Sequence, residues 1–139
     1  MLVCGHGNRD SRCGVLGPVL GDEFSDKLQD AGVTVLSNDS SAGQTDGTSP
    51  RWKADGASAG LSAKVAMISH IGGHKFAGNV IVYVPPSWAP HPLAGYGVWY
   101  GRIRPEMVEG LVRETVMGGR VVRNAFRGAV RKGGEIVLL

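Results

Sequence analysis

Residues 1–32 of the chain read MLVCGHGNRDSRCGVLGPVLGDEFSDKLQDAG, and two kinds of element follow each other closely in them. Residues 1–4 form a short apolar run, which is typical of a buried strand, and a glycine-rich segment at residues 5–14 interrupts it. Over residues 15–31 the apolar side chains recur at steps of three and four, and Gly32 follows as a stop signal. The spacing predicts a first helix directly after a first strand.

Further strands and a second helix are indicated along the rest of the chain. Residues 33–36 are a short strand candidate, and residues 63–69, 79–84 and 97–103 are three more, rich in Val, Ile, Tyr and Trp. A helix is expected over residues 105–117, because Pro105 suits a first helical turn and two glycines follow Met117. The order of elements, with an early crossover and a later hairpin, is that of an α/β fold.

Two connections differ in composition from these elements. Residues 37–60 are dominated by small and polar side chains without an apolar period, so we expect a mobile insertion loop there. Residues 85–96 contain four prolines and cannot be the interior of a strand. His91 lies in this connection between two prolines, and we expect it to be an exposed loop histidine.

The segment at residues 120–131 has a helical pattern of charge. Its arginines recur at three- and four-residue steps while apolar residues fill the other positions, which predicts an amphipathic helix with one basic stripe. The stripe is either an ordinary solvated face or a docking surface for an acidic redox partner. The residues of the stripe are Arg120, Arg123, Arg127 and Arg131.

Two cysteines and two histidines form a cluster of soft metal ligands. Cysteine thiolate and imidazole together suit either a tetrahedral zinc ion or an iron–sulfur cluster of mixed ligation. The two cysteines are too far apart for the tight knuckle of a zinc finger, and the histidines come much later, so the pattern favours a site assembled from two loops of a folded domain. The four residues are Cys4, Cys13, His70 and His74.

The residues around these ligands resemble a known family. Residues 3–14 (VCGHGNRDSRCG) and 69–79 (SHIGGHKFAGN), supported by VWYGRI at residues 98–103, are together similar to the sucrase/ferredoxin-like family of thioredoxin-fold 2Fe-2S proteins, including its fungal altered-inheritance-of-mitochondria branch. The resemblance implies a thioredoxin-like fold, with a central mixed sheet flanked by helices, and electron transfer. It implies one 2Fe-2S cluster, with Cys4 and Cys13 on one iron and His70 and His74 on the other.

Several neighbours of the ligands are expected to support the site. Gly72 and Gly73 let backbone amides approach the cluster sulfides, and the charged residues of the first loop either pair with each other or form a solvated turn. A Rieske-type arrangement cannot be completed, because no Cys-x-x-His follows the Cys-x-His step at residues 4–6. The expected supporting residues are His6, Arg9, Asp10, Gly72, Gly73 and Lys75.

The sequence therefore predicts a carrier of single electrons more than an enzyme. We expect proton-coupled redox chemistry, because each ligating imidazole keeps a second ring nitrogen that can titrate. Two alternatives stay open, a zinc-stabilised interaction domain with the same four ligands and a metal-free thiol oxidoreductase that acts through Cys4 and Cys13. The expected partners are redox donor and acceptor proteins, without nucleic acid or membrane, and a homodimer is left open.

Composition sets limits on organisation. The 139 residues, 42% of them hydrophobic, suffice for one domain with a core, and no apolar run is long enough to span a membrane. The net charge is only +3, and the first residues do not resemble a secretory leader. Members of the family carry a preceding domain, so we expect residues 1–139 to be the C-terminal domain of a longer protein. We expect an intracellular location, with mitochondria favoured over cytosol.

Overall fold

The structure is a computed structural model that describes residues 1–5, 11–36, 60–69, 71 and 73–138. The insertion loop predicted at residues 37–60 lies outside these ranges, apart from Gly60.

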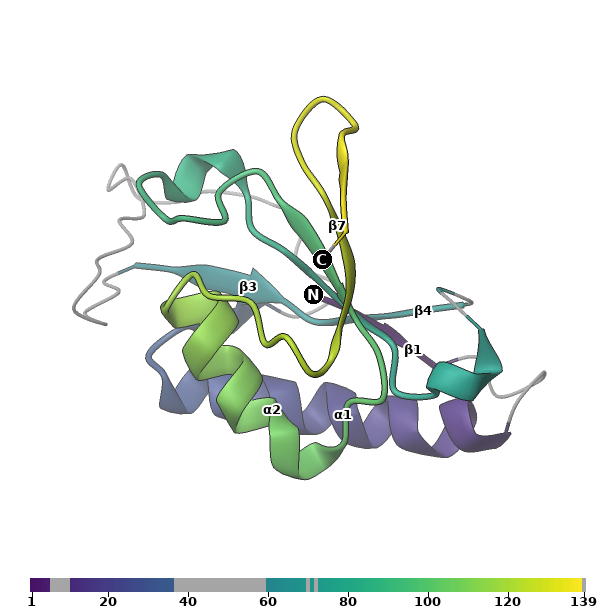
Figure 1. Cartoon of the computed structure of the whole chain (residues 1–139). Helices are drawn as coiled ribbons and strands as arrows, with labels where there is room; N and C mark the ends of the chain where they lie inside the picture. Colours follow the sequence, from purple (N-terminus) through teal and green to yellow (C-terminus); the bar gives the residue numbers. More distant parts are fainter. Residues whose placement is uncertain (6–10, 37–59, 70, 72, 139) are drawn as a thin grey trace.

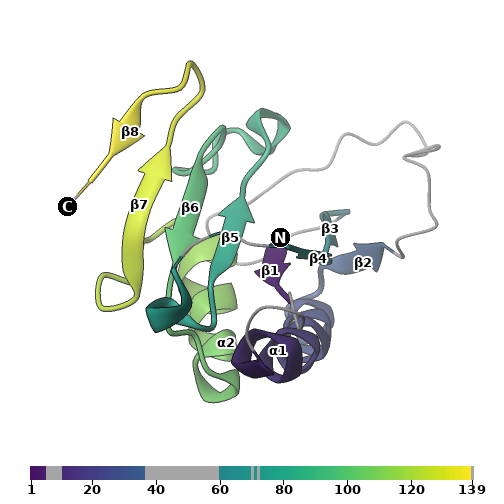
Figure 2. The same ribbon diagram turned by 90° about the vertical axis from the view of Figure 1, so that its right-hand side faces the viewer.

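A six-stranded mixed sheet forms the centre of the molecule, with the strand order β4-β1-β5-β6-β7-β8 (Figure 2). β1 pairs with β4 in parallel and with β5 in antiparallel orientation, and the remaining neighbours are antiparallel. The strands are β1 (Leu2–Cys4), β4 (Ala66–Ile68), β5 (Val80–Tyr83), β6 (Gly97–Tyr100), β7 (Phe126–Val130) and β8 (Ile136–Val137).

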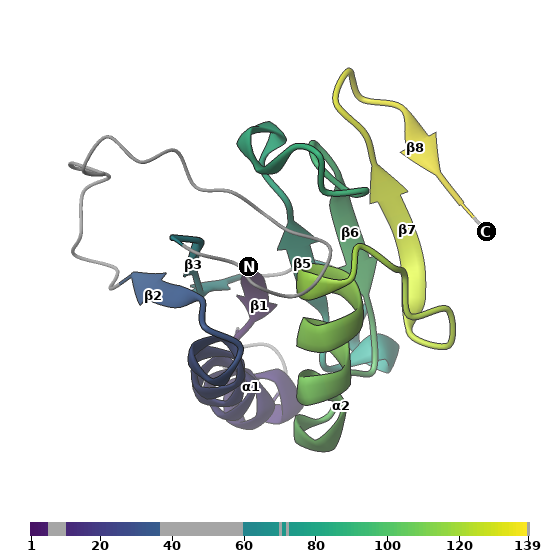
Figure 3. The ribbon, with the colours of Figure 1, turned by 90° about the vertical axis from the view of Figure 1, so that its left-hand side faces the viewer.

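A second, two-stranded sheet lies beside the first (Figure 3). It pairs β2 (Thr34–Leu36) with β3 (Ser62–Lys64) in parallel. The single strand predicted at residues 63–69 is therefore two strands, because Val65 separates β3 from β4 and each pairs in a different sheet.

Two helices cover one face of the main sheet (Figure 1). α1 (Ser11–Asp30) starts four residues before the predicted position and ends before Gly32, whose positive φ of 79° suits glycine. α2 (Pro105–Leu111) continues as a π-helix, η3 (Val112–Met117), so the second predicted helix is present over its whole predicted length. Neither α1 nor any other described helix is long and apolar enough to cross a membrane.

The core fills the space between these helices and the sheet. Leu20, Phe24 and Leu28 lie on one side of α1 at steps of four, as the apolar period predicts, and each is fully buried. Burying a side chain of this size contributes about 1.5–3 kcal/mol. The strands contribute the alternate residues that point to the helices, which are Val3, Val80, Val82, Val98 and Tyr100. The expected α/β, thioredoxin-like fold with a central mixed sheet is confirmed.

The prediction of a helix over residues 120–131 is wrong. Residues 126–130 form β7, which pairs in antiparallel orientation with β6, and a turn precedes it. β7 then pairs with β8 across a turn in which Gly133 and Gly134 both have positive φ. β7 supplies hydrogen-bond partners for the backbone groups along the edge of β6, which would otherwise be unpaired. The spacing of the arginines along the sequence gives no sign of this pairing.

The prediction that His91 is exposed is also wrong. Its side chain is buried, Nε2 lies 2.9 Å from the carbonyl oxygen of Val116, and Nδ1 accepts a hydrogen bond from the backbone N–H of Leu93 at 3.0 Å. These partners require a neutral ring with the proton on Nε2. The ring also makes an edge contact with Trp88, at 6.0 Å between centroids. His91 is therefore part of the packing between the proline-rich connection and the end of η3.

Candidate metal centre

One edge of the main sheet collects the segments that carry the predicted ligands, at the right-hand side of Figure 1. Because β1 and β4 are parallel, both end there, and the backbone N–H of Gly5 donates to the carbonyl oxygen of Ile68 at 3.1 Å. β5 is antiparallel to β1 and begins at the same edge. The chain that follows β1 and the chain that follows β4 therefore start beside each other, as expected for a site built from two loops.

Cys4 and Cys13 lie at this edge as buried thiols that are not joined in a disulfide. Cys4 ends β1 and is 4% exposed, while Cys13 lies in the first turn of α1 and is 3% exposed. The absence of a side chain at Gly17 allows α1 to lie close to β1, because a Cβ atom there would be only 2.7 Å from the carbonyl oxygen of Cys4. Cys13 is one turn before Gly17, about 6 Å along the helix axis and on the same helix face.

The histidine segment returns to the same edge as a short 3-10 helix, η1 (His74–Phe76). Its backbone is held by two hydrogen bonds, from Phe76 N–H to Gly73 O at 2.9 Å and from Arg102 N–H to Phe76 O at 3.3 Å. The structure places the backbone of His74 there, and Gly73 and Lys75 are exposed. The other predicted residues of the site lie outside the described part of the chain: His6, Arg9, Asp10, His70, Gly72 and the side chain of His74.

A buried asparagine joins the site to β7. Asn79 is 1% exposed, and its backbone oxygen accepts a hydrogen bond from Cys4 N–H at 3.0 Å. Its side-chain oxygen Oδ1 accepts a hydrogen bond from Arg127 Nη1 at 2.9 Å, across 48 positions of sequence. The side-chain nitrogen Nδ2 is buried and has no hydrogen-bond partner among the residues that the structure describes.

Three cations surround the ring of Phe76, two residues after His74 in sequence. The Arg127 guanidinium carbon lies 3.8 Å from the ring centroid, the Arg102 guanidinium carbon 5.2 Å and Lys75 Nζ 5.1 Å. Such contacts stabilise a cation by about 0.5–2 kcal/mol. Within the described ranges none of the three forms an ion pair with a carboxylate, so positive charge gathers beside the candidate site.

Sequence reasoning missed the roles of Phe76, Asn79 and Arg102. All three lie within the segments that carry the family resemblance, residues 69–79 and 98–103, which was the available signal for them. Arg102 has a positive φ of 59°, a left-handed conformation that its residue type does not suggest. Gly101 beside it leaves room for Arg127, since a Cβ atom at Gly101 would lie 2.6 Å from Arg127 Cδ.

The four arginines predicted as a docking stripe have separate surroundings. Arg120 Nε lies 2.8 Å from Glu114 Oε2, and this hydrogen bond holds the pKa of Glu114 below its usual value. Arg131 pairs with Glu135 at 3.1 Å, Arg127 belongs to the Phe76 cluster, and Arg123 is exposed. They do not form a helical stripe, and their role in docking stays a prediction.

Two further observations limit the site. Among residues 1–5, 11–36, 60–69, 71 and 73–138, no three His, Cys, Asp or Glu side chains gather to hold a metal ion, so a complete ligand set needs the histidine side chains outside those ranges.

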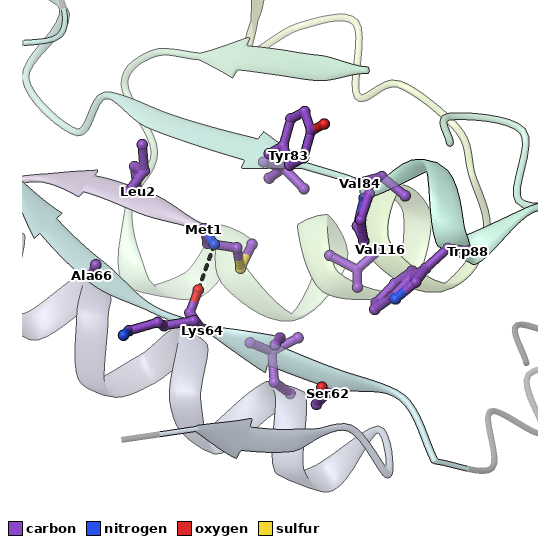
Figure 4. Close-up of a pocket in the computed structure, with 13 residues that line it drawn as sticks. Met1, Leu2, Ser62, Lys64, Ala66, Tyr83, Val84, Trp88 and Val116 are labelled. Carbon is purple, nitrogen blue, oxygen red and sulfur yellow. Dashed lines mark hydrogen bonds between the residues drawn. The ribbon is translucent and has the colours of Figure 1, made fainter. Parts of the chain in front are cut away.

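A cavity of about 420 Å³ lies at the other end of β1 (Figure 4). Its lining is largely aliphatic and includes Val84, Trp88 and Val116, and the Met1 ammonium donates to Lys64 O at its wall. Among the lining residues that the structure describes, the Met1 thioether is the one soft metal ligand.

Curated relatives match most of the chain. It is 37% identical to "Altered inheritance of mitochondria protein 32" of Debaryomyces hansenii over 130 residues. This matched region covers 94% of this chain and 35% of the relative. The chain is 35% identical over 130 residues to the protein of the same name from Meyerozyma guilliermondii, covering 94% and 34%. It is 32% identical over 117 residues to "Actin patches distal protein 1" of Saccharomyces cerevisiae, covering 84% and 29%.

The chain thus spans about a third of the length of the first two relatives. No solved structure matches it significantly. The family model described as "Sucrase/ferredoxin-like" matches residues 1–128, which include the strand and helix that carry the cysteines, the histidine segment and the start of β7. The chain therefore belongs to the sucrase/ferredoxin-like family.

Proposed function

We propose that this chain binds one 2Fe-2S cluster through Cys4, Cys13, His70 and His74 and carries single electrons. The observation that supports the proposal most directly is the pair of buried, unbridged thiols at the sheet edge where the histidine segment begins. Buried thiols without a disulfide partner are suited to a metal centre, because a thiolate loses its burial penalty when it ligates a metal ion.

The residues present fit such a group by their chemistry. Two thiolates and two imidazoles are a donor set for mixed-ligand iron–sulfur clusters. The side-chain nitrogen of Asn79, which has no partner among the described residues, offers a hydrogen-bond donor beside Cys4. When bound, the cluster supplies a site for one electron. Cys4 and Cys13 would hold one iron from β1 and α1, and His70 and His74 the other from the segment after β4.

The protein around the site has two tasks. One is to keep water from the thiols of Cys4 and Cys13, both of which are almost fully buried. The ring nitrogens of His70 and His74 that face away from the iron would hold a proton more tightly in the reduced state, so that an electron and a proton arrive together.

Metal analysis of the purified chain tests the proposal. We expect two iron atoms and two acid-labile sulfides per chain, with visible colour, and a reduction potential that falls by about 59 mV per pH unit where proton and electron are coupled. Cys4→Ala should lose the cluster, whereas His74→Cys should retain it more often, because a thiolate can replace an imidazole as ligand. A colourless chain with one zinc would contradict the proposal and favour a zinc-stabilised domain.

The location and partners of the whole protein are proposals as well. The names of the first two relatives support an intracellular protein with a link to mitochondria. The positive charge around Phe76 supports a redox partner with an acidic surface. Fractionation of cells that express the full-length protein tests the location, and recovery outside mitochondria would contradict it.

A further inference from the structure

Asn79 lies directly across from Cys4 in the sheet. The register pairs Leu2 with Ile81 and Val3 with Val80, and the hydrogen bond from Cys4 N–H to Asn79 O continues it by one step. Side chains of directly opposed residues in an antiparallel pair lie on the same face, with Cβ atoms about 4.5–5.5 Å apart. The side chain of Asn79 is therefore a close neighbour of the Cys4 thiol.

The contact with Arg127 determines which side-chain atom of Asn79 is the oxygen Oδ1 and which is the nitrogen Nδ2. A guanidinium has only donors, so the atom that it contacts at 2.9 Å must be the oxygen, Oδ1. Arg127 itself is held against the Phe76 ring, at 3.8 Å from the centroid, and over Gly101. With Oδ1 engaged, the amide nitrogen Nδ2 is the free end.

The free end is a donor in need of an acceptor. Asn79 is 1% exposed, and Nδ2 has no partner among the residues that the structure describes. A buried donor without a partner costs about 1–3 kcal/mol, and few are found in native proteins. The position beside Cys4 indicates what kind of acceptor is missing, since the group at Cys4 in the proposed function presents sulfur.

We propose that Asn79 Nδ2 donates a hydrogen bond to a sulfur of the centre held by Cys4, and that Arg127 positions the amide for this. The inference rests on the proposed function and adds a residue that adjusts the redox behaviour of the site. A donor to cluster sulfur stabilises the reduced, more negative state and so raises the reduction potential. Asn79 does not ligate the metal, so its replacement leaves the iron content unchanged.

Two variants at Asn79 test the hydrogen bond. Asn79→Leu removes the donor and keeps a side chain of similar size. Asn79→Asp removes the donor but keeps an acceptor for Arg127, so it serves if the leucine variant folds poorly. Iron, sulfide and potential are measured on each holo protein. We expect wild-type iron content and a potential shifted to more negative values in both variants, further in Asn79→Asp because its carboxylate adds a negative charge. The shift in Asn79→Leu is the one that reports the lost donor.

A second readout uses stability. In the metal-free chain Asn79→Leu removes both the unpartnered donor and the acceptor of Arg127, so the gain and the loss offset each other and the unfolding temperature should stay near that of wild type. In the metal-loaded chain it should unfold at a lower temperature than wild type. A merely structural role of Asn79 would lower both unfolding temperatures together.

Matched arginine variants test the positioning role. Arg127→Met and Arg102→Met each remove one cation beside Phe76, but only Arg127 contacts Asn79. The negative shift of the potential should be larger for Arg127→Met. Equal shifts for the two variants would overturn the role of Arg127.

The outcomes separate the two proposals. A wild-type chain without iron and sulfide would overturn the proposed function, and this inference with it. A loaded wild type whose potential and unfolding temperatures are matched by Asn79→Leu and Asn79→Asp would overturn the hydrogen bond alone.

Discussion

At the scale of single residues, the candidate site depends on close contacts that only particular side chains permit. Gly17 lets α1 touch the end of β1, and its absent side chain would otherwise meet the Cys4 oxygen, the Gly5 Cα and the Met67 methyl group, each at 2.7 Å. Two of these three atoms belong to the backbone and cannot move away cheaply. The approach of Cys13 to the strand that carries Cys4 therefore relies on one missing methyl group.

Replacement of Gly17 by Ala tests this contact. We expect a loss of about 1–3 kcal/mol in the free energy of unfolding, because the added methyl group forces the helix away from the strand. The iron content should fall as well. Gly110→Ala is the matched control, since a Cβ atom there meets nothing within 4 Å and the substitution should stabilise α2 by about 0.5–1 kcal/mol. Urea unfolding of both variants decides the matter, and equal effects would contradict the argument.

At the scale of elements, the sequence predicts the helices and strands whose buried side chains recur at regular steps along the chain. α1 was predictable because Leu20, Phe24 and Leu28 recur at helical spacing. β7 was not, because the apolar residues of 120–131 fit a helix, and the open edge of β6 that receives them is remote in sequence. The same holds at the site: Cys4 and Cys13 stand out by residue type, whereas the contact between Asn79 and Arg127 joins residues 48 positions apart.

The end of the second helix is tied to β6 by a buried pair of hydroxyl groups. Tyr100 Oη and Thr115 Oγ1 are 2.7 Å apart, and Thr115 Oγ1 donates to Arg120 O at 2.9 Å. The Val122 N–H donates to Tyr100 Oη at 3.4 Å. Burial raises the pKa of Tyr100, so the phenol stays protonated and can take part as a donor. These bonds connect β6, η3 and the turn that leads to β7.

Thr115→Val should therefore cost about 1–3 kcal/mol in the free energy of unfolding, because it leaves the Arg120 carbonyl and the Tyr100 hydroxyl with one partner fewer while preserving shape. Thr34→Val in β2 changes the same atoms at an exposed strand position and should stay within about 0.5 kcal/mol of wild type. Thermal unfolding measures both. Similar costs at the two positions would mean that the hydroxyl network contributes little.

At the scale of the whole molecule, stability depends on the protonation of a residue far from the site. Burial lowers the pKa of His91 below its usual value near 6.5, although hydrogen bonds to the Val116 and Thr115 backbone oppose this. A proton on Nδ1 would also displace the bond from Leu93 N–H. As the pH falls through about 6.5, the unfolded chain therefore takes up a proton that the folded chain refuses.

We expect the free energy of unfolding to be fully retained above about pH 7 and to decline as the pH falls below about 6.5. His91→Gln should remove part of this decline. Urea unfolding at several pH values between about 5 and 8 gives the slopes. A wild-type slope unchanged in His91→Gln would show that another group is responsible.

The placement of β1 in the sheet has a consequence for synthesis of the chain. β1 is made before both of its neighbours, since Leu2 pairs with Ala66 in β4 and with Ile81 in β5. During translation this interior strand has no partner until the residues of β4, near Ala66, have been made, and its second neighbour follows with the residues near Ile81. Long-range pairing of this kind is slow to form. Cys4 is therefore made before the strands that flank it, so its thiol stays accessible in the nascent chain until β4 and β5 have been made and the sheet closes around it.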